Sequence, residues 1–316
     1  MKVAIEYEKD QYLEFENHSI NMVVGYNQES KWKIIRSLYR FNEGKQLDLL
    51  EENVYGDDGL SILIDDKLMK AKQLKILPIT SFSEMNQQAS IGKNTLMQFF
   101  ITQKLNDMTI QHQFEMLRDY YILVEQRLNE LFEKEKLENI MLKTEMPKLN
   151  DVLKQATIIG QNDVPLPLMD SNQLVNTYLR LLRYYLENQS SYVLILLRHE
   201  DDFLNVDSLD VFYRSLRELA EKYPQLIILA VKDNQKIKIA DYNTEEIIFV
   251  GDSIQQLPPF DIIKKSIYLN YPVEFRLSDE ELVDQLAYIL PNINIKMDSD
   301  PSTNMVLYDV VQSLLK

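Results

Sequence analysis

Short apolar runs predict buried β-strands near both ends of the chain. Residues 20–24 (INMVV), 192–197 (YVLILL), 226–231 (LIILAV) and 246–250 (EIIFV) are almost wholly apolar over the length of one strand. Such runs are typical of strands that are covered on both faces, as in a parallel sheet. Between the second and third runs, residues 207–222 carry apolar positions at helical spacing. This order predicts a strand–helix–strand unit with parallel strands.

Other patterns predict further elements around these strands. Residues 3–7, 61–64 and 74–79 have strand-like patterns, whereas residues 65–72 are expected to form a short helix or a turn. Residues 33–41 have apolar positions at helical spacing and follow a strand and a glycine, which predicts a helix.

The middle of the chain is predicted to be helical. From about residue 94 to residue 139 the pattern is helical almost without a break, with no proline or glycine. Seven positions in it are spaced alternately three and four residues apart: Phe114, Leu117, Tyr121, Val124, Leu128, Leu131 and Glu135. Such a stripe predicts a long helix that packs against another helix. The expected partners within the chain are residues 96–105 and 174–186.

Together these elements predict an α/β protein with a mainly parallel sheet, interrupted by an inserted helical domain. We expect residues 1–85 and 191–316 to form one α/β head, and residues 86–190 to form a helical leg. Residues 278–281 (SDEE) have the pattern of a capping box, which predicts another helix in the second part of the head.

Composition excludes several classes of function. The 316 residues include no cysteine, three histidines and seven glycines, and the formal net charge is −15. The lack of cysteine excludes disulfides, thiol nucleophiles and Cys-ligated metal centres, and the glycine positions exclude a G-x-G-x-x-G motif. The charge argues against a membrane-surface binder and an unspecialised nucleic-acid coat. With no signal-peptide pattern and no apolar run near ~18 residues, a cytoplasmic protein is expected.

Residues 23–38 (VVGYNQESKWKIIRSL) have the layout of a phosphate-binding loop, with a strand, a glycine, a lysine and a helix in order. A functional loop reads G-x-x-x-x-G-K-[ST], because its glycines turn backbone N–H groups onto phosphates and its hydroxyl holds Mg²⁺. Gly25 and Lys31 fit, but Ser30 replaces the second glycine and Trp32 replaces the hydroxyl residue. We expect a degenerate loop without nucleotide hydrolysis. An ordinary strand–turn–helix with a coincidental lysine is the alternative.

Acidic residues follow the apolar run at residues 192–197. Glu200, Asp201 and Asp202 are adjacent in the sequence, and clustered carboxylates suit a hard cation such as calcium. A degenerate metal-binding strand end is a second interpretation. Helix capping with a solvated turn is the third.

Basic residues gather in several places despite the negative net charge. One group lies along a predicted helix: Lys31, Lys33, Arg36 and Arg40. Others follow the long helix or lie within nine residues of one another: Lys143, Lys148 and Lys154, and Lys67, Lys70, Lys72 and Lys75. Each group is either a surface for DNA phosphates or an ordinary solvated face.

A family resemblance rests on the altered loop at residues 23–38, on DDFLNVDSLDVFYRSLRELAEKYPQLIILAV at residues 201–231, and on the order of segments. In these features the chain resembles the long-form variant of the DNA-end-binding ring protein of type II-A CRISPR loci, their accessory spacer-acquisition protein. The resemblance implies a P-loop-ATPase-like head, a helical leg and no ATPase activity. The divergence at Ser30 and Trp32 is similar to that of a non-hydrolytic family.

The same resemblance implies partners and an assembly. It implies a homotetrameric ring whose positive channel binds double-stranded DNA ends, and calcium stabilises that ring in the shorter members of the family. The sequence has no DNA-reading helix motif, so binding without sequence preference is expected. The CRISPR integrase complex and the effector nuclease are the implied protein partners. The candidate DNA contacts are Lys31, Lys33, Arg36, Arg40, Lys143, Lys148 and Lys154, and the candidate calcium ligands are Glu200, Asp201 and Asp202. A ring would gather four copies of a weak basic patch around one axis.

Two other functions fit parts of the sequence. One is an active head-and-coiled-coil P-loop ATPase of DNA repair, which Ser30, Trp32 and the lack of an LSGGQ signature oppose. The other is a helical protein-interaction scaffold, in which the helix at residues 114–138 recruits partners.

Overall fold

The computed structural model describes residues 1–44, 47–55, 60–137, 140–145, 152–153, 156–233, 237–239, 243–271, 276–293 and 304–315. The chain divides into two compact units, one formed by Met1–Phe82 with Gln189–Lys316 and the other by Ser83–Asn188. The sequence predicts boundaries after residues 85 and 190, close to these positions. The first unit is thus assembled from both ends of the chain.

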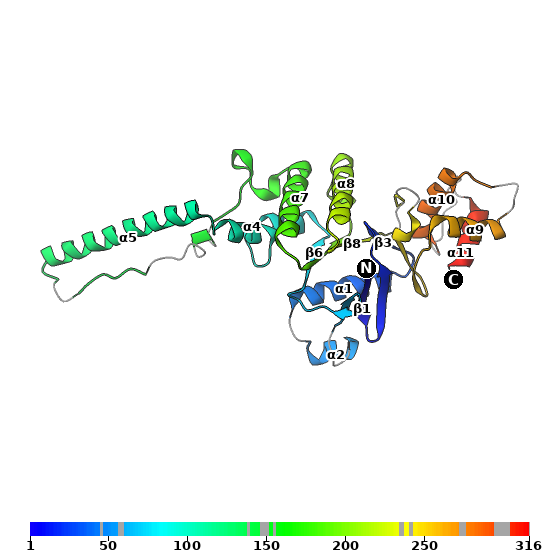
Figure 1. Cartoon of the computed structure of the whole chain (residues 1–316), viewed down its shortest axis with the longest axis horizontal. Helices are drawn as coiled ribbons and strands as arrows, with labels where there is room; N and C mark the ends of the chain where they lie inside the picture. The colour runs from blue at the N-terminus through cyan, green and yellow to red at the C-terminus, as the bar shows by residue number, and fades with distance from the viewer. Residues whose placement is uncertain are drawn as a thin grey trace. The chain divides into compact units, whose positions relative to one another are not determined.

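The larger sheet of the first unit has six strands in the order β10-β9-β3-β8-β7-β6. Figure 1 labels β3, β8 and β6. These strands are β3 (Asn21–Val24), β6 (Leu74–Ile79), β7 (Tyr192–Leu197), β8 (Leu226–Val231), β9 (Ile247–Val250) and β10 (Ile254–Gln256). All adjacent pairs are parallel except β9 and β10. The prediction of an α/β fold with a mainly parallel sheet is confirmed, and so is the parallel pairing of β7 with β8.

A smaller antiparallel sheet has the strand order β2-β1-β4-β5. Its strands are β1 (Lys2–Glu8), β2 (Gln11–Glu16), β4 (Ile62–Ile64) and β5 (Lys67–Leu68). The sequence analysis missed β2, although its buried Leu13 and Phe15 alternate with polar residues. The segment at residues 65–72 contains β5 between turns, so the expected turn is confirmed and the alternative of a helix is wrong.

Helix α1 (Gln28–Glu43) joins the two sheets into one core, and α2 (Leu49–Tyr55) follows it. Ile34 and Leu38 of α1 lie in one apolar cluster with Ile5 of β1 and Leu229 of β8. Helix α8 (Val206–Lys222) contacts β8 and buries Phe212 and other apolar residues. The cluster around α1 includes Ile227 and Val231 of β8 as well as Leu229 but not Phe212 of α8, so α1 and α8 cover opposite faces of the large sheet (Figure 1).

Three helices complete the first unit: α9 (Phe260–Asn270), α10 (Asp279–Asn292) and α11 (Met305–Leu314). The capping box predicted for α10 is confirmed. The Glu281 carboxylate accepts from the backbone N–H of Ser278 at 2.8 Å, and Ser278 Oγ accepts from the N–H of Glu281 at 3.3 Å. This exchange satisfies two N–H groups at the start of the helix.

The second unit is helical and contains α3 (Phe82–Ala89), α4 (Leu96–Lys104), α5 (Met108–Lys134) and α7 (Ser171–Asn188). The helix expected from residue 94 to residue 139 is interrupted, because Asp107 caps a new helix by accepting from the N–H of Thr109 at 2.8 Å. Helices α4 and α7 pack through rings, with Phe100 and Tyr184 centroids 4.9 Å apart. None of the described helices is both long and apolar enough to span a membrane.

The predicted packing of α5 inside the chain is wrong. Over its 27 residues α5 buries no side chain within the described structure. Eleven large apolar residues of α5 are exposed: Met108, Ile110, Met116, Leu117, Tyr120, Tyr121, Ile122, Leu123, Val124, Leu128 and Leu131. The apolar stripe is therefore present, but α4 and α7 pack against each other and leave it uncovered.

Candidate functional site

The loop between β3 and α1 comprises three residues, Gly25, Tyr26 and Asn27. Gly25 has φ +119°, and a Cβ at this position would lie 2.3 Å from the carbonyl oxygen of Val250, so only glycine fits. The Asn27 side chain accepts from the backbone N–H of Ser30 at 3.0 Å and caps α1. Ser30 therefore lies inside the helix, and its N–H does not face an open loop.

The same loop is fastened to the end of β9. The N–H and side-chain amide of Asn27 donate to the carbonyls of Val250 and Gly251, at 3.2 and 3.1 Å. The Tyr26 hydroxyl accepts from the N–H of Asp252 at 3.0 Å. These bonds occupy groups that a phosphate-binding loop would turn toward its ligand.

Lys31 bonds to the end of β8, the strand on the other side of β3 from β9. Its side chain is 2% exposed, and its Nζ donates to the carbonyl of Lys232 at 3.0 Å and to Asp233 Oδ1 at 3.4 Å. Burial lowers the pKa of Lys31, and the Asp233 charge opposes this shift. Lys31 ties α1 to the end of β8, and it is not an accessible contact for DNA in this conformation.

Residues at the end of a third strand, β7, also contact Asp233. Arg198, which follows β7, donates from Nη2 to Asp233 Oδ2 at 3.2 Å, and His199 Nε2 lies 3.6 Å from the same oxygen. Burial would raise the pKa of Asp233, but Lys31 and Arg198 outweigh it and the pKa is lowered. Three cationic or titratable groups thus surround one carboxylate at the carboxyl ends of β3, β7 and β8.

The three candidate calcium ligands do not converge. Glu200 is fully buried, and its Oε1 accepts from Lys232 Nζ and from the Tyr213 hydroxyl, whereas Asp201 and Asp202 are exposed. Burial, followed by the Glu200 charge, raises the pKa of Tyr213. Among the described residues no group of three or more His, Asp or Glu side chains could hold a metal ion. The three adjacent carboxylates do not form one site, because Glu200 is buried against Lys232 and Tyr213 whereas Asp201 and Asp202 are exposed.

The basic residues of α1 are largely neutralised by neighbouring carboxylates. Lys33 Nζ lies 2.9 Å from Glu8 and 2.9 Å from Glu29. Arg40 forms a bidentate ion pair with Glu51, in which Nε and Nη2 donate to the two carboxylate oxygens at 2.6 and 2.8 Å. Arg36 is exposed and lies over the Tyr55 ring, with its Cζ 5.8 Å from the centroid. The structure does not gather the α1 cations into a free basic face.

The other three candidate DNA contacts follow α5. Lys143 is exposed in the segment at residues 140–145. Lys148 and Lys154 lie outside the described residues.

The comparison that decides the family is one of sequence. The family model described as CRISPR-associated protein Csn2, subfamily St, matches residues 5–316. The chain belongs to the Csn2 family. Its role therefore lies in the adaptation stage of type II-A CRISPR immunity, as the resemblance implied. No curated protein sequence matches the chain.

The fold of this Csn2-family chain is similar to that in a crystal structure of Stu0660 of Streptococcus thermophilus. The TM-score is 0.84 over 99% of this chain and 93% of that chain, at 20% sequence identity. At this identity the likeness establishes the shared fold across both units and carries no residue roles.

Two sets of cations outside the predicted site are exposed in the structure. Lys67 lies in the short strand β5 and Lys70 and Lys72 follow it, whereas Arg180 and Arg183 lie three residues apart on α7. None of the five forms an ion pair with a described residue. Clustering in sequence was the available signal for the lysines, and i,i+3 spacing was the signal for the arginines.

Lys75 does not belong with the exposed lysines. It lies on β6, where burial lowers its pKa to about 8. An amine with this pKa is still mostly charged at pH 7, but Lys75 is partly buried, and this makes it a poor contact for a phosphate.

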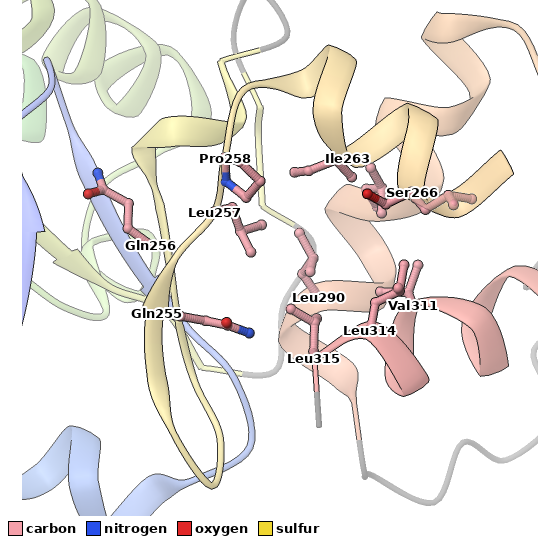
Figure 2. Close-up of a pocket in the computed structure, with 12 residues that line it drawn as sticks. Gln255, Gln256, Leu257, Pro258, Ile263, Ser266, Leu290, Val311, Leu314 and Leu315 are labelled. Atoms are coloured by element: carbon pink, nitrogen blue, oxygen red, sulfur yellow. The ribbon is translucent and has the colours of Figure 1, made fainter. Parts of the chain in front are cut away.

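Two pockets of the first unit are not basic surfaces. One of about 240 Å³ is lined by β10, α9, α10 and α11, with Leu257, Leu290 and Val311 facing it and no charged side chain among its described lining residues (Figure 2). Another of about 610 Å³ lies beside α8. It has four cations and four carboxylates in its lining: Arg214, Arg217, Lys232 and Lys238, and Asp201, Asp210, Glu218 and Glu221. Neither pocket suits a polyanion.

Proposed function

We propose that the chain acts in spacer acquisition as a non-enzymatic homotetrameric ring that binds ends of double-stranded DNA without sequence preference. The observation that carries this proposal is the uncovered apolar stripe of α5, because it requires a partner outside the described part of the chain. Helices of this kind gain their stability from packing on an apolar face. Membership of the Csn2 family supports the adaptation role. The proposed number of four copies comes from the ring that the family resemblance implies.

Assembly also accounts for DNA binding by an acidic chain. The formal net charge of −15 would repel DNA if it were evenly spread. The exposed cations around β5 and on α7 have no acidic partner among the described residues, so their charge is available to phosphates. In a closed ring, symmetry repeats each of these patches around one axis and their potentials add.

The geometry of the β3–α1 loop favours a non-hydrolytic head. The head is P-loop-ATPase-like in its layout, but the loop amides, Asn27 and Lys31 are bonded to the ends of β9 and β8. A nucleotide would have to break these bonds before its phosphates could be held. We expect neither catalysis nor a catalytic residue, and we expect calcium, if it binds, to use ligands contributed by more than one copy.

A mobility shift on linear and on closed circular duplexes of equal length tests this function, with native mass measured on the same sample. The expected result is a four-copy mass, binding to linear DNA that weakens steeply as salt rises, and poor retention on circles. Absence of a shift on linear duplex at low salt, with and without Ca²⁺, would contradict DNA binding. A monomeric mass at the concentrations that shift DNA would contradict the ring.

A protein-interaction scaffold is the second candidate, and the same exposed stripe of α5 favours it. In that case α5 binds another protein, such as the CRISPR integrase complex or the effector nuclease, and not a second copy. Purified chain would then stay monomeric, and placing charged residues in the stripe would remove the partner protein but leave DNA binding intact.

A further inference from the structure

We propose that the carboxyl ends of β3, β7 and β8 form an oxyanion site that the chain fills with its own carboxylate, Asp233. An oxyanion of the phosphate class would enter this site only when that carboxylate is removed or neutralised. The inference concerns the head alone and does not depend on the ring or on DNA binding.

The place in the fold is where α/β sheets bind anions. β3 lies between β8 and β9, and the chain passes from β8 on one side of β3 to β9 on the other. Ligands of open parallel sheets bind outside the carboxyl ends of the strands at such a switch point. Lys31 and the start of α1 are on this edge, so a cation and the positive end of a 16-residue helix both face it.

The donors around Asp233 are those that an oxyanion needs. Lys31 Nζ and Arg198 Nη2 contact its two oxygens at 3.4 and 3.2 Å, and His199 Nε2 lies at 3.6 Å. Carboxylates and phosphates accept hydrogen bonds from the same kinds of charged donor, and arginine suits both. The Nε of Arg198 is buried and has no hydrogen-bond partner among the described residues, so the guanidinium has unused capacity.

The charges nearby favour a single anion at this point. Lys31 and Arg198 carry two positive charges against the one carboxylate of Asp233, whereas Lys232 is already neutralised by Glu200. The remaining carboxylate nearby is Asp202, with Oδ2 3.8 Å from His199 Nδ1 on the exposed side. A second anion would face repulsion from Asp233 at contact distance. If Asp233 becomes neutral, two partly buried cations lose their counter-ion, which is costly unless another anion replaces it.

The test compares wild-type protein with Asp233→Asn, using inorganic phosphate as the probe at constant ionic strength. Thermal unfolding and calorimetric titration with phosphate are measured against matched chloride. We expect phosphate to bind D233N at least about tenfold more tightly than wild type, because one negative charge at ~4 Å is removed. The double variant K31M/D233N should lose this gain.

Asp210→Asn is the matched control, since it removes the carboxylate charge from an exposed ion pair with Lys238 whose N–O distance is also 3.4 Å. It should not change phosphate binding. If D233N does not fold in chloride, phosphate should restore its folding, and failure to do so overturns the proposal. Equal phosphate affinity in wild type and D233N, or binding that survives in K31M/D233N, would overturn it as well.

Discussion

The side-chain amide of Asn129 pairs with both polar backbone groups of Leu142. Its Oδ1 accepts from the N–H of Leu142 at 2.7 Å, and its Nδ2 donates to the Leu142 carbonyl at 2.9 Å. One helical turn earlier, Glu125 Oε2 accepts from the N–H of Thr144 at 2.7 Å. Four helical residues rise ~6 Å and two extended residues span ~6.6 Å, so the helix and the returning segment stay in register. The returning segment thus covers part of the polar side of α5 and leaves the apolar stripe of the helix open.

Replacing Asn129 should release the returning segment. In Asn129→Leu the two bonds to Leu142 are lost, at about 1 kcal/mol each, and the amides of Leu142 and Thr144 should therefore exchange about thirtyfold faster. Hydrogen exchange resolved by residue measures this. Glu130→Gln is the control, because it breaks only the exposed pair of Arg127 with Glu130. Equal exchange in N129L and wild type would mean that the amide pair does not hold the segment.

Charge in the stripe of α5 should block self-association. Leu117→Glu with Leu128→Glu places two carboxylates on exposed apolar positions, and desolvating them in an interface would cost several kcal/mol. We expect the native mass to fall to that of the single chain, as measured by light scattering or native mass spectrometry. Gln126→Glu adds a charge to an exposed position outside the stripe and should leave the mass unchanged.

Exposed and paired lysines should differ in their effect on DNA binding. The triple change of Lys67, Lys70 and Lys72 to Gln should weaken binding to all duplex sequences alike and reduce the salt slope by ~1 for each lysine in contact with phosphate. Lys33→Gln should have little effect, because Glu8 and Glu29 already neutralise that ammonium. Mobility shifts over a series of salt concentrations distinguish the two. The opposite ranking would show that ion pairing within the chain does not predict its DNA surface.

Gly25 should tolerate no side chain. Gly25→Ala demands a φ of +119° from alanine and drives Cβ against a backbone oxygen, so we expect a loss of about 3 kcal/mol in the free energy of unfolding. Gly44→Ala is the matched control. Its φ is +64° and its nearest contact is Ala71 at 3.6 Å, so it should lose only about 1 kcal/mol. Urea unfolding of both variants checks the difference.

The pair of Arg217 with Glu246 should be a strong internal contact. The carboxylate of Glu246 is fully buried and is held at 2.5 and 2.7 Å by Arg217. Arg217→Met leaves that charge unpaired and should cost about 3 kcal/mol, and adding Glu246→Gln should recover part of the loss. Lys238→Met, which breaks the exposed pair with Asp210, should change stability by under ~0.5 kcal/mol. Denaturant midpoints of the variants give the comparison.

The sequence predicted elements well where one physical signal dominated. The apolar runs of β7, β8 and β9 could be satisfied only by burial on both faces, and the capping box of α10 is a local device. The weaker alternation of β2 went unnoticed because every second position is polar. The stripe of α5 was found, but its cover was misjudged, since periodicity defines an apolar face and does not say which chain covers it.

The candidate site was harder to predict because it depends on the ends of several strands. The spacing of Gly25 and Lys31 was visible, but the capping by Asn27, which starts the helix early, depends on competition between a side chain and a ligand for the same N–H. The acidic residues predicted from the sequence, Glu200, Asp201 and Asp202, follow β7. The carboxylate that meets Lys31 is Asp233 at the end of β8, where LIILAVKD offered the same signal. Strand order decides which end matters, and order is not local information.

Because the apolar face of α5 is uncovered, the proposed assembly depends on the concentration of the protein in the cell. An apolar face that is completed by another copy obeys mass action, so the share of chains in complete assemblies rises with their concentration. Under the proposed assembly, a cell with little of this protein holds mostly open chains, and raising its expression converts them without any ligand or modification. The dose of the protein, set at transcription and by proteolysis, would then decide when the machinery that captures DNA is in place.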